Sequence, residues 1–320
     1  MTVSLSERLP AGLPTGLTAG VAAGLGAGAV WGTTFVAPLV APGFSSADYT
    51  AGRFLSCGLF SLAWLLWQTW CTAPGRRRDR WPDAAQARGA LGLSVLGYTG
   101  YYLLLVYGVA DAGAALPALI VGTLPVWMML LGKPEHLRWS SLLPGLLLTA
   151  TGMALMMDAT TEELGTAGSG HFWRGVLLAV AAMLAWLAFG MLNARWVRRH
   201  TGVGSTAWAN WLGLAAGLGG LLLWLGWGTA WSELVVRPGF GVFVAVCVFT
   251  GIGSAWIAAV LWNVASRRLS TSLAGQLVVS ETVFALIYAF AWSGDWPARE
   301  QLLACVMFVA GILASIRAHQ

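Results

Sequence analysis

Ten long apolar runs follow one another along this 320-residue chain and leave little room for anything else. A helix needs about 20 consecutive apolar residues to cross the hydrocarbon layer of a bilayer. The runs have about that length, and charged or Gly/Pro-rich connections separate them. They lie at residues 17–40, 48–72, 89–110, 114–132, 140–157, 173–194, 205–228, 239–263, 271–292 and 299–317. The sequence therefore predicts an all-α membrane protein with ten transmembrane helices.

The composition points to the same class of protein. Hydrophobic residues make up 58% of the chain and charged residues 10%, whereas ordinary soluble domains carry about 25% charged residues. The first residues lack a basic stretch followed by a small-residue cleavage site, so we expect the first helix to remain in the mature protein. The break at 110–116 is the shortest of the predicted connections, and Asp111, Gly113 and Pro117 favour it.

The basic residues are distributed unevenly among the connections. Cytoplasmic loops of membrane proteins carry an excess of Lys and Arg. With the N-terminus inside, fourteen of the eighteen Lys and Arg residues fall on inner segments, and Arg53, Arg174, Arg237 and Arg299 fall outside. Removing one crossing would scramble this alternation. We therefore expect both termini in the cytoplasm.

The chain divides into two halves of five helices each, 1–157 and 158–320. Five is odd, so equivalent helices cross the membrane in opposite directions, as in the inverted repeats of many secondary transporters. Aromatic residues also match at a constant offset of 155, pairing Trp31 with Trp186 and Tyr101 with Trp256. The sequence predicts two inverted repeats around a central cavity, with substrate bound where the halves meet.

Glycines at four-residue spacing line one side of the first run. Gly20, Gly24, Gly28 and Gly32 share a face, and small residues at this spacing let another helix approach closely. Tight helix packing is the first interpretation of this stripe, and a flexing element is the second.

Glu281 is the only acidic residue deep inside a predicted span. A charged group at bilayer depth costs at least about 2.5 kcal/mol, so its side chain should face the bundle interior. Three roles stay open for it, namely binding a substrate ammonium group, carrying a coupling proton, or hydrogen-bonding between helices. Gln276 lies nearby, and Asn263 lies towards a cytoplasmic helix end, where a link between helices competes with a ligand role.

Several aromatic residues lie deeper than the headgroup region. Trp31, which shares a helix face with Thr34, is either a headgroup anchor or a cavity residue. Trp127, Trp186 and Trp256 lie at similar depth, while most other tryptophans lie near helix ends and are expected in the interfacial belt. The third run carries Tyr98, Tyr101 and Tyr102 on one face. Buried Tyr hydroxyls need partners, which favours a wet cavity over lipid.

Nothing in the chain resembles an enzyme site. The sequence has no Walker loop, HExxH or GxSxG motif, and its four histidines lie in predicted loops or the tail. The four cysteines are far apart and have no metal-ligand spacing, so we interpret them as packing residues. We expect no catalytic residue, cofactor or metal site, and no nucleic-acid partner.

Four short segments resemble a known family. They are Trp31–Phe35, Ala118–Pro125, Trp186–Asn193 and Trp262–Asn263. They resemble the drug/metabolite transporter superfamily, in particular its EamA-type ten-helix members, and among these the YddG-type aromatic amino-acid exporters. The resemblance implies a central cavity between two inverted repeats that opens alternately to the two sides. The ninth helix of the family often carries a proline where this chain has Glu281.

Together these features predict a secondary transporter that exports amino acids across a bacterial inner membrane. Aromatic amino acids are favoured, with methionine and threonine as further candidates. Two alternatives remain, an exporter of hydrophobic drugs or other metabolites and a non-transporting membrane scaffold or assembly subunit. The expected partners are a small-molecule substrate and the bilayer, and a monomer is compatible with the sequence. The candidate substrate-binding residues are Trp31, Thr34, Tyr98, Tyr101, Tyr102, Trp127, Trp186, Trp256, Asn263, Gln276 and Glu281.

Overall fold

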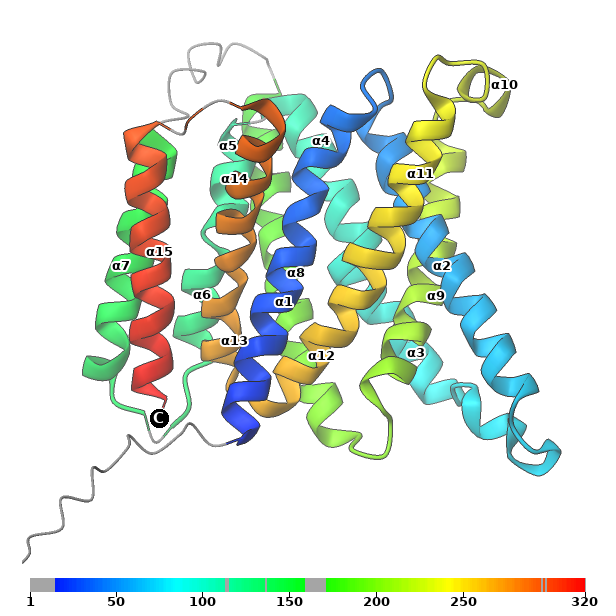
Figure 1. Ribbon diagram of the computed structural model, residues 1–320, viewed down its shortest axis with the longest axis horizontal. Coiled ribbons are helices and arrows are strands. Elements are labelled where there is room, and N and C mark those ends of the chain that lie inside the picture. The colour runs from blue at the N-terminus through cyan, green and yellow to red at the C-terminus, as the bar shows by residue number, and fades with distance from the viewer. Residues whose placement is uncertain are drawn as a thin grey trace, which may run out of the picture.

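The computed structural model describes residues 15–112, 115–135, 137–158, 171–294, 296 and 298–319, and the regular elements of that part of the chain are all helices. They form ten rods that stand side by side (Figure 1). The first five rods are α1 (Thr15–Val40), α2 (Ser46–Trp70), α3, η2 and α4 in series (Ala84–Ser94, Val95–Thr99 and Gly100–Ala112), α5 and α6 (Ala115–Gly122 and Leu124–Leu131), and α7 (Trp139–Asp158). The second five are α8 (Phe172–Arg199), α9 (Ser205–Trp227), α11, η4 and α12 in series (Phe240–Thr250, Gly251–Ile257 and Ala258–Arg268), α13 and α14 (Thr271–Val278 and Ser280–Ser293), and α15 (Arg299–Ala318). Two short helices, η1 (Pro74–Arg80) and α10 (Trp231–Leu234), lie in connections.

The rods have the length and composition of membrane spans. Six of the described helical segments are long and apolar enough to cross a bilayer, and α1 and α2 have 26 and 25 residues. At about 1.5 Å per residue, either of these two could cross the hydrocarbon layer. The predicted all-α membrane fold is confirmed. Several helices run further than predicted; α8 continues to Arg199, where two arginines in its last turn interact favourably with the helix dipole.

The two sets of five rods pack together in a symmetric pattern. The rod of α2 packs on that of α9, α7 packs on α15, and α6 packs on α13, so equivalent rods meet as pairs. The contact of α4 with α8 is matched by the contact of α12 with α1. This is the arrangement of two inverted five-helix repeats. The boundary at 157/158 stays a prediction.

Two rods are interrupted at equivalent places. The rod of α5 and α6 breaks at Thr123, and the rod of α13 and α14 breaks at Val279. At both breaks the helix changes to tighter i→i+3 bonds, from the Thr123 nitrogen to the Ile120 oxygen and from the Val279 nitrogen to the Gln276 oxygen. Such half-helices are common at the substrate sites of secondary transporters.

Two other rods contain a wider π-helical turn at equivalent places. These are η2 within the third rod and η4 within the eighth, and each continues directly into the following α-helix. π turns inside helices occur frequently at functional sites. The sequence pattern gave no sign of them. Each turn carries one candidate residue, Tyr98 in η2 and Trp256 in η4.

The glycine stripe of α1 makes close contacts with neighbouring helices. A Cβ atom at Gly28 would collide with the Ser280 hydroxyl oxygen, and one at Gly32 would lie 2.9 Å from the backbone nitrogen of Ala285. Gly20 and Gly24 face Leu269 and Leu277 at similarly short range. The interpretation of the stripe as a packing surface is confirmed, and it brings α1 against the first turns of α14.

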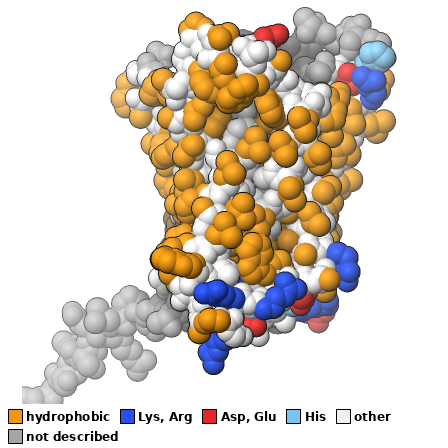
Figure 2. Space-filling model, turned by 90° about the vertical axis from the view of Figure 1, so that its right-hand side faces the viewer, with side chains coloured by type: hydrophobic (Ala, Val, Ile, Leu, Met, Phe, Trp, Pro, Cys, Tyr) orange, Lys and Arg blue, Asp and Glu red, His pale blue; other side chains and the backbone are white. Residues whose placement is uncertain are grey.

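Charged side chains gather at the two ends of the bundle. Figure 2 shows a broad hydrophobic band between them, with Lys and Arg side chains at the lower end. We call this the basic end; it holds the connections 71–83, 200–204 and 269–270. Large hydrophobic side chains on the band are exposed, as expected for a surface that faces lipid. Exposed tryptophans include Trp67, Trp70, Trp139, Trp173, Trp227, Trp231, Trp292 and Trp296.

Candidate functional site

Three tryptophans from three different rods meet inside the bundle. The ring of Trp31 in α1 lies 5.4 Å from that of Trp262 in α12 and 6.3 Å from that of Trp186 in α8, measured between centroids. Trp186 and Trp262 are also 6.3 Å apart. Trp262 is buried, whereas Trp31 and Trp186 keep part of their surface exposed. Of the two interpretations left open for Trp31, this position favours the interior one.

Further aromatic rings continue from this cluster towards α2. Trp186 contacts Phe189, Phe189 contacts Tyr98, and Tyr98 contacts Phe54, with centroid distances of 5.9, 5.6 and 5.7 Å. All three contacts are edge to face, the geometry that aromatic pairs prefer. We call the whole set the aromatic row; it consists of Trp262, Trp31, Trp186, Phe189, Tyr98 and Phe54.

An arginine lies at the end of the aromatic row. The Arg53 Cζ atom is 5.6 Å from the centroid of the Phe54 ring. The sequence prediction counted Arg53 among the charges of the outer side; in the structure it lies seven residues into α2, about 10 Å along the helix from Ser46. An arginine inside a span costs at least about 2.5 kcal/mol and marks a functional site by default.

Glu281 lies opposite this arginine, near the middle of its rod. It follows the break at Val279 and stands in the first turn of α14, where the helix dipole stabilises a carboxylate. Its backbone packs against Gly28 and Gly32 of α1. The side chain interacts electrostatically with Arg53 of α2 and Tyr101 of α4. In the part of the chain that the structure describes, Glu281 and Arg53 do not form a contact ion pair.

The three tyrosines predicted to share a face have separate surroundings. Tyr98 belongs to the aromatic row, and Tyr101 interacts electrostatically with both Arg53 and Glu281. The Tyr102 hydroxyl donates a hydrogen bond of 2.5 Å to the backbone oxygen of Ser46 at the start of α2. Tyr98 and Tyr101 therefore border the charged groups, while Tyr102 ties α4 to α2.

Trp256 lies in a different aromatic cluster. Its indole nitrogen donates a 2.6 Å hydrogen bond to the Asn210 side chain, and its ring lies 4.9 Å from Phe60 and 5.6 Å from Trp64. These partners belong to α2 and α9. The predicted site grouped Trp256 with Trp186, and the structure does not bring these two rings together.

Two of the polar candidates are engaged in links between helices. The Asn263 side-chain oxygen accepts a 3.0 Å hydrogen bond from Asn193, and the Asn193 oxygen accepts one of 2.7 Å from Trp208. The Gln276 amide donates a 2.7 Å bond to the Thr149 hydroxyl. Asn193, Asn263 and Gln276 are at most 1% exposed. The structure thus favours the helix-linking interpretation for Asn263 and Gln276.

The remaining candidates, Thr34 and Trp127, are not part of the aromatic row. The Thr34 hydroxyl donates to the backbone oxygen of Trp31 one turn earlier. Trp127 in α6 is 43% exposed, and its indole nitrogen donates a 3.1 Å bond to Thr123 at the helix break. Among the described residues, the Trp127 ring makes no ring contact with the aromatic row.

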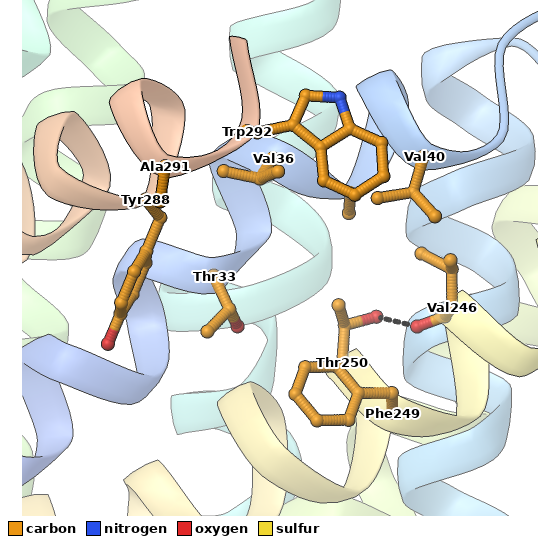
Figure 3. A pocket seen from close by; sticks show the side chains of 10 residues that line it. Thr33, Val36, Val40, Val246, Phe249, Thr250, Tyr288, Ala291 and Trp292 are labelled. Atoms are coloured by element: carbon orange, nitrogen blue, oxygen red, sulfur yellow. Dashed lines mark hydrogen bonds between the residues drawn. The ribbon is translucent and has the colours of Figure 1, made fainter. Parts of the chain in front are cut away.

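A surface cavity is separate from these charges. It has a volume of about 300 Å³ and lies between α1, α11 and α14 (Figure 3). Its polar side-chain groups are three hydroxyls and the indole nitrogen of Trp292, and the hydroxyls of Thr33 and Thr250 already donate to backbone oxygens of their own helices. Phe249 and Trp292 on its wall are exposed. This cavity has no charged group that could bind an ionised substrate. Its lining residues are Thr33, Val36, Ala37, Val40, Val246, Phe249, Thr250, Tyr288, Ala291 and Trp292.

Polar contacts join rods at both ends of the bundle. At the basic end the Arg198 guanidinium donates to the Leu269 backbone oxygen at 3.3 Å and to the Thr271 hydroxyl at 3.1 Å. At the opposite end Arg174 holds Asp111 through two hydrogen bonds of 2.6 and 2.8 Å. These bonds keep the pKa of the Asp111 carboxyl below its usual value. The contacts link α8 to α12 and α13 at one end and to α4 at the other.

The arrangement defines a class of protein. Inverted five-helix repeats, half-helices at equivalent positions and charged side chains at membrane depth are features of secondary membrane transporters.

Comparisons with known proteins agree with this class and give the family. Residues 18–158 match the EamA-like transporter family. The chain is 30% identical over 296 residues to the inner membrane protein YtfF of Escherichia coli (strain K12), covering 88% of this chain and 89% of that protein. A crystal structure of a protein with 20% sequence identity superposes with a TM-score of 0.71, over 95% of this chain and 99% of that one. The chain belongs to the EamA-like transporter family, within the drug/metabolite transporter superfamily.

A second curated relative has a more specific name. It is the "Probable terminal-alkyne amino-acid exporter" of Streptantibioticus cattleyicolor, 24% identical over 244 residues, which are 75% of each chain. The family resemblance stated from the sequence is confirmed by the comparisons, whereas the YddG-like specificity stays a proposal.

Proposed function

We propose that this transporter exports amino acids, with aromatic ones favoured, across a bacterial inner membrane by alternating access. The observation that carries the proposal is the Glu281 carboxylate in the middle of a membrane span, where it interacts electrostatically with Arg53 and Tyr101. An amino acid has an ammonium group for the carboxylate. An aromatic amino acid also has a ring that can pack edge to face on Trp31 and Trp186, and such contacts contribute about 0.5–1.5 kcal/mol each beyond the area they bury.

The distribution of charge supports the orientation in this proposal. The basic end carries Arg76, Arg77 and Arg78 in a single short connection. By the positive-inside rule this end belongs in the cytoplasm, and with it both ends of the chain. Substrate would then enter from the basic end and leave from the end that holds Asp111 and Arg174.

The symmetric helix breaks support alternating access. In inverted-repeat transporters the site stays near mid-membrane while one repeat rocks against the other. The breaks at Thr123 and Val279 have lost the regular i→i−4 bonding and are suited to absorb such a motion. The contacts of Arg198 would hold the cytoplasmic side closed and would have to separate when that side opens.

The amino-acid assignment also agrees with the name of the second relative, which is itself described as a probable amino-acid exporter. A hydrophobic drug would be satisfied by the aromatic row alone and would leave the Glu281 charge unused. A scaffold subunit has no need for the charge of Arg53 or of Glu281 inside a membrane span, where charged side chains are unfavourable.

The test is uptake of radiolabelled phenylalanine, tryptophan, methionine and threonine into liposomes that contain only this protein, beside empty liposomes. We expect saturable uptake that the aromatic amino acids inhibit best. No flux of any amino acid, from protein shown to be folded, would contradict the amino-acid assignment. Flux of a lipophilic cationic dye such as ethidium instead would indicate that the substrates are hydrophobic drugs.

A further inference from the structure

Arg53 is a membrane-embedded cation whose donors lack partners. Its Nε is buried and has no hydrogen-bond partner, and the guanidinium makes no hydrogen bond to any residue that the structure describes. A guanidinium carries five N–H donors in a planar fork that matches a carboxylate. A buried donor without a partner is unfavourable, so this group is poised to receive an acceptor.

The natural acceptor in this chain is held at a distance. Glu281 is close enough to Arg53 to interact electrostatically, yet the two do not touch in the described structure. Tyr98 and Tyr101 border the same region and also interact electrostatically with Arg53. A positive and a negative group therefore interact here without an ion-pair contact, and two tyrosines interact with the same guanidinium.

A ligand that can partner both of these groups carries both charges. We propose that Arg53 binds the α-carboxylate of the substrate while Glu281 binds its ammonium group, so that the site recognises the complete zwitterion. This assignment rests on the proposed function and adds its missing half, the receptor for the carboxylate. Each charged hydrogen bond would be short and strong in this low-dielectric setting.

The position of the aromatic row agrees with this orientation. Arg53 stacks on Phe54, and Phe54 contacts Tyr98, so the row begins at the carboxylate receptor and leads to Trp186. A substrate whose carboxylate lies on Arg53 can place its side chain along these rings.

The proposal makes the site selective against close analogues. Phenylalaninamide keeps the ammonium group and the ring but has lost the carboxylate, and 3-phenylpropionate has lost the ammonium group. Each would leave one protein charge buried without a partner, which is strongly unfavourable. The same principle allows a site built for a polar group to reject the analogue that lacks it by several orders of magnitude.

The experiment measures inhibition of labelled phenylalanine uptake in proteoliposomes by unlabelled phenylalanine, phenylalaninamide and 3-phenylpropionate. In the wild-type protein we expect both analogues to inhibit at least 100-fold more weakly than phenylalanine. Arg53→Gln should weaken inhibition by unlabelled phenylalanine at least tenfold. Inhibition by phenylalaninamide should stay unchanged or become stronger. Arg53→Lys should restore part of the affinity for phenylalanine, because it keeps the charge without the fork.

Arg237→Gln is the matched control, since Arg237 is exposed and donates only to the backbone of Gly43. Variants are compared only if their thermal unfolding and size-exclusion profiles match the wild type. If Arg53 were a structural counter-ion alone, Arg53→Gln would weaken inhibition by phenylalanine and by phenylalaninamide equally. That result would overturn the assignment. Equal inhibition of the wild type by phenylalanine and phenylalaninamide would overturn it as well, with amino-acid transport intact. Absence of all amino-acid flux would overturn the proposed function and this assignment together.

Discussion

Pro125 and Glu281 occupy equivalent places in the two repeats, each two residues after the break in its rod. In α6 the break has a local cause, because a proline has no backbone donor and disfavours a continuous helix. In α14 the break persists without a proline, and the position holds a carboxylate instead. The second repeat thus has an equivalent break, with a charged residue where the first repeat has a proline.

Replacing Glu281 with Gln removes this charge and keeps a similar volume. We expect exchange of labelled phenylalanine for unlabelled phenylalanine across the liposome membrane to fall at least tenfold, because the substrate ammonium loses its partner. Exchange without any gradient separates the roles left open for Glu281. If exchange continued and only uptake driven by a pH gradient disappeared, the residue would carry a coupling proton.

The two deep tryptophans Trp186 and Trp256 form a matched pair. Trp186 belongs to the aromatic row, whereas Trp256 packs on Phe60 and Trp64. Trp186→Ala should raise the concentration of phenylalanine for half-maximal uptake about tenfold. Trp256→Ala, which removes the same side chain at similar depth, should alter it less than twofold in protein of unchanged fold. The same increase in both variants would argue against the row as the binding surface.

Gly32 tests the contact between α1 and α14. A methyl group at this position would lie 2.9 Å from the Ala285 nitrogen, so Gly32→Ala should destabilise the protein by about 1–3 kcal/mol through overpacking. Gly226→Ala in α9 is the control, because a Cβ atom there meets nothing within 4 Å. Melting temperatures in detergent measure both. A Gly32→Ala melting temperature equal to that of Gly226→Ala would show that the helices can separate without strain.

Arg198 tests the closure of the basic end. Arg198→Ala removes the links to Leu269 and Thr271, and should favour the state that is open on this side. A cysteine introduced at the buried Ser266, in protein whose exposed Cys71 is replaced by Ser, should then react several times faster with a water-soluble maleimide. Arg199→Ala, its neighbour in the last turn of α8, should leave the rate unchanged. Equal labelling rates in the Arg198→Ala and Arg199→Ala variants would show that the Arg198 contacts do not keep this end closed.

The sequence was sufficient for the ten helices because each span is a separate apolar run that hydrocarbon alone requires. Glu281 could be singled out for the same reason, since its charge interrupts such a run. Arg53 also lay inside a predicted run, at 48–72, but was considered only as one of the charges of the outer side. Phe189 lies one helical turn after Trp186, so its shared face could have been read from the spacing.

The grouping of Trp256 with Trp186 shows what the pattern could not contain. The depth of a residue in the membrane follows from its position along the apolar run. The side of the helix on which its side chain projects depends on the geometry of every preceding turn. The π turn η4 inserts extra residues into the eighth rod, so the direction of Trp256 departs from the regular 3.6-residue repeat. The break at Val279 could not be predicted either, because neither Val279 nor the residues beside it are proline or glycine.

The most direct test is to locate the substrate in the protein. Crystals grown with 4-iodophenylalanine would give one strong anomalous peak at the iodine atom. The account predicts this peak beside Trp31 and Trp186, within the aromatic row. A peak only in the cavity between α1, α11 and α14 (Figure 3), or none at saturating ligand, would contradict it.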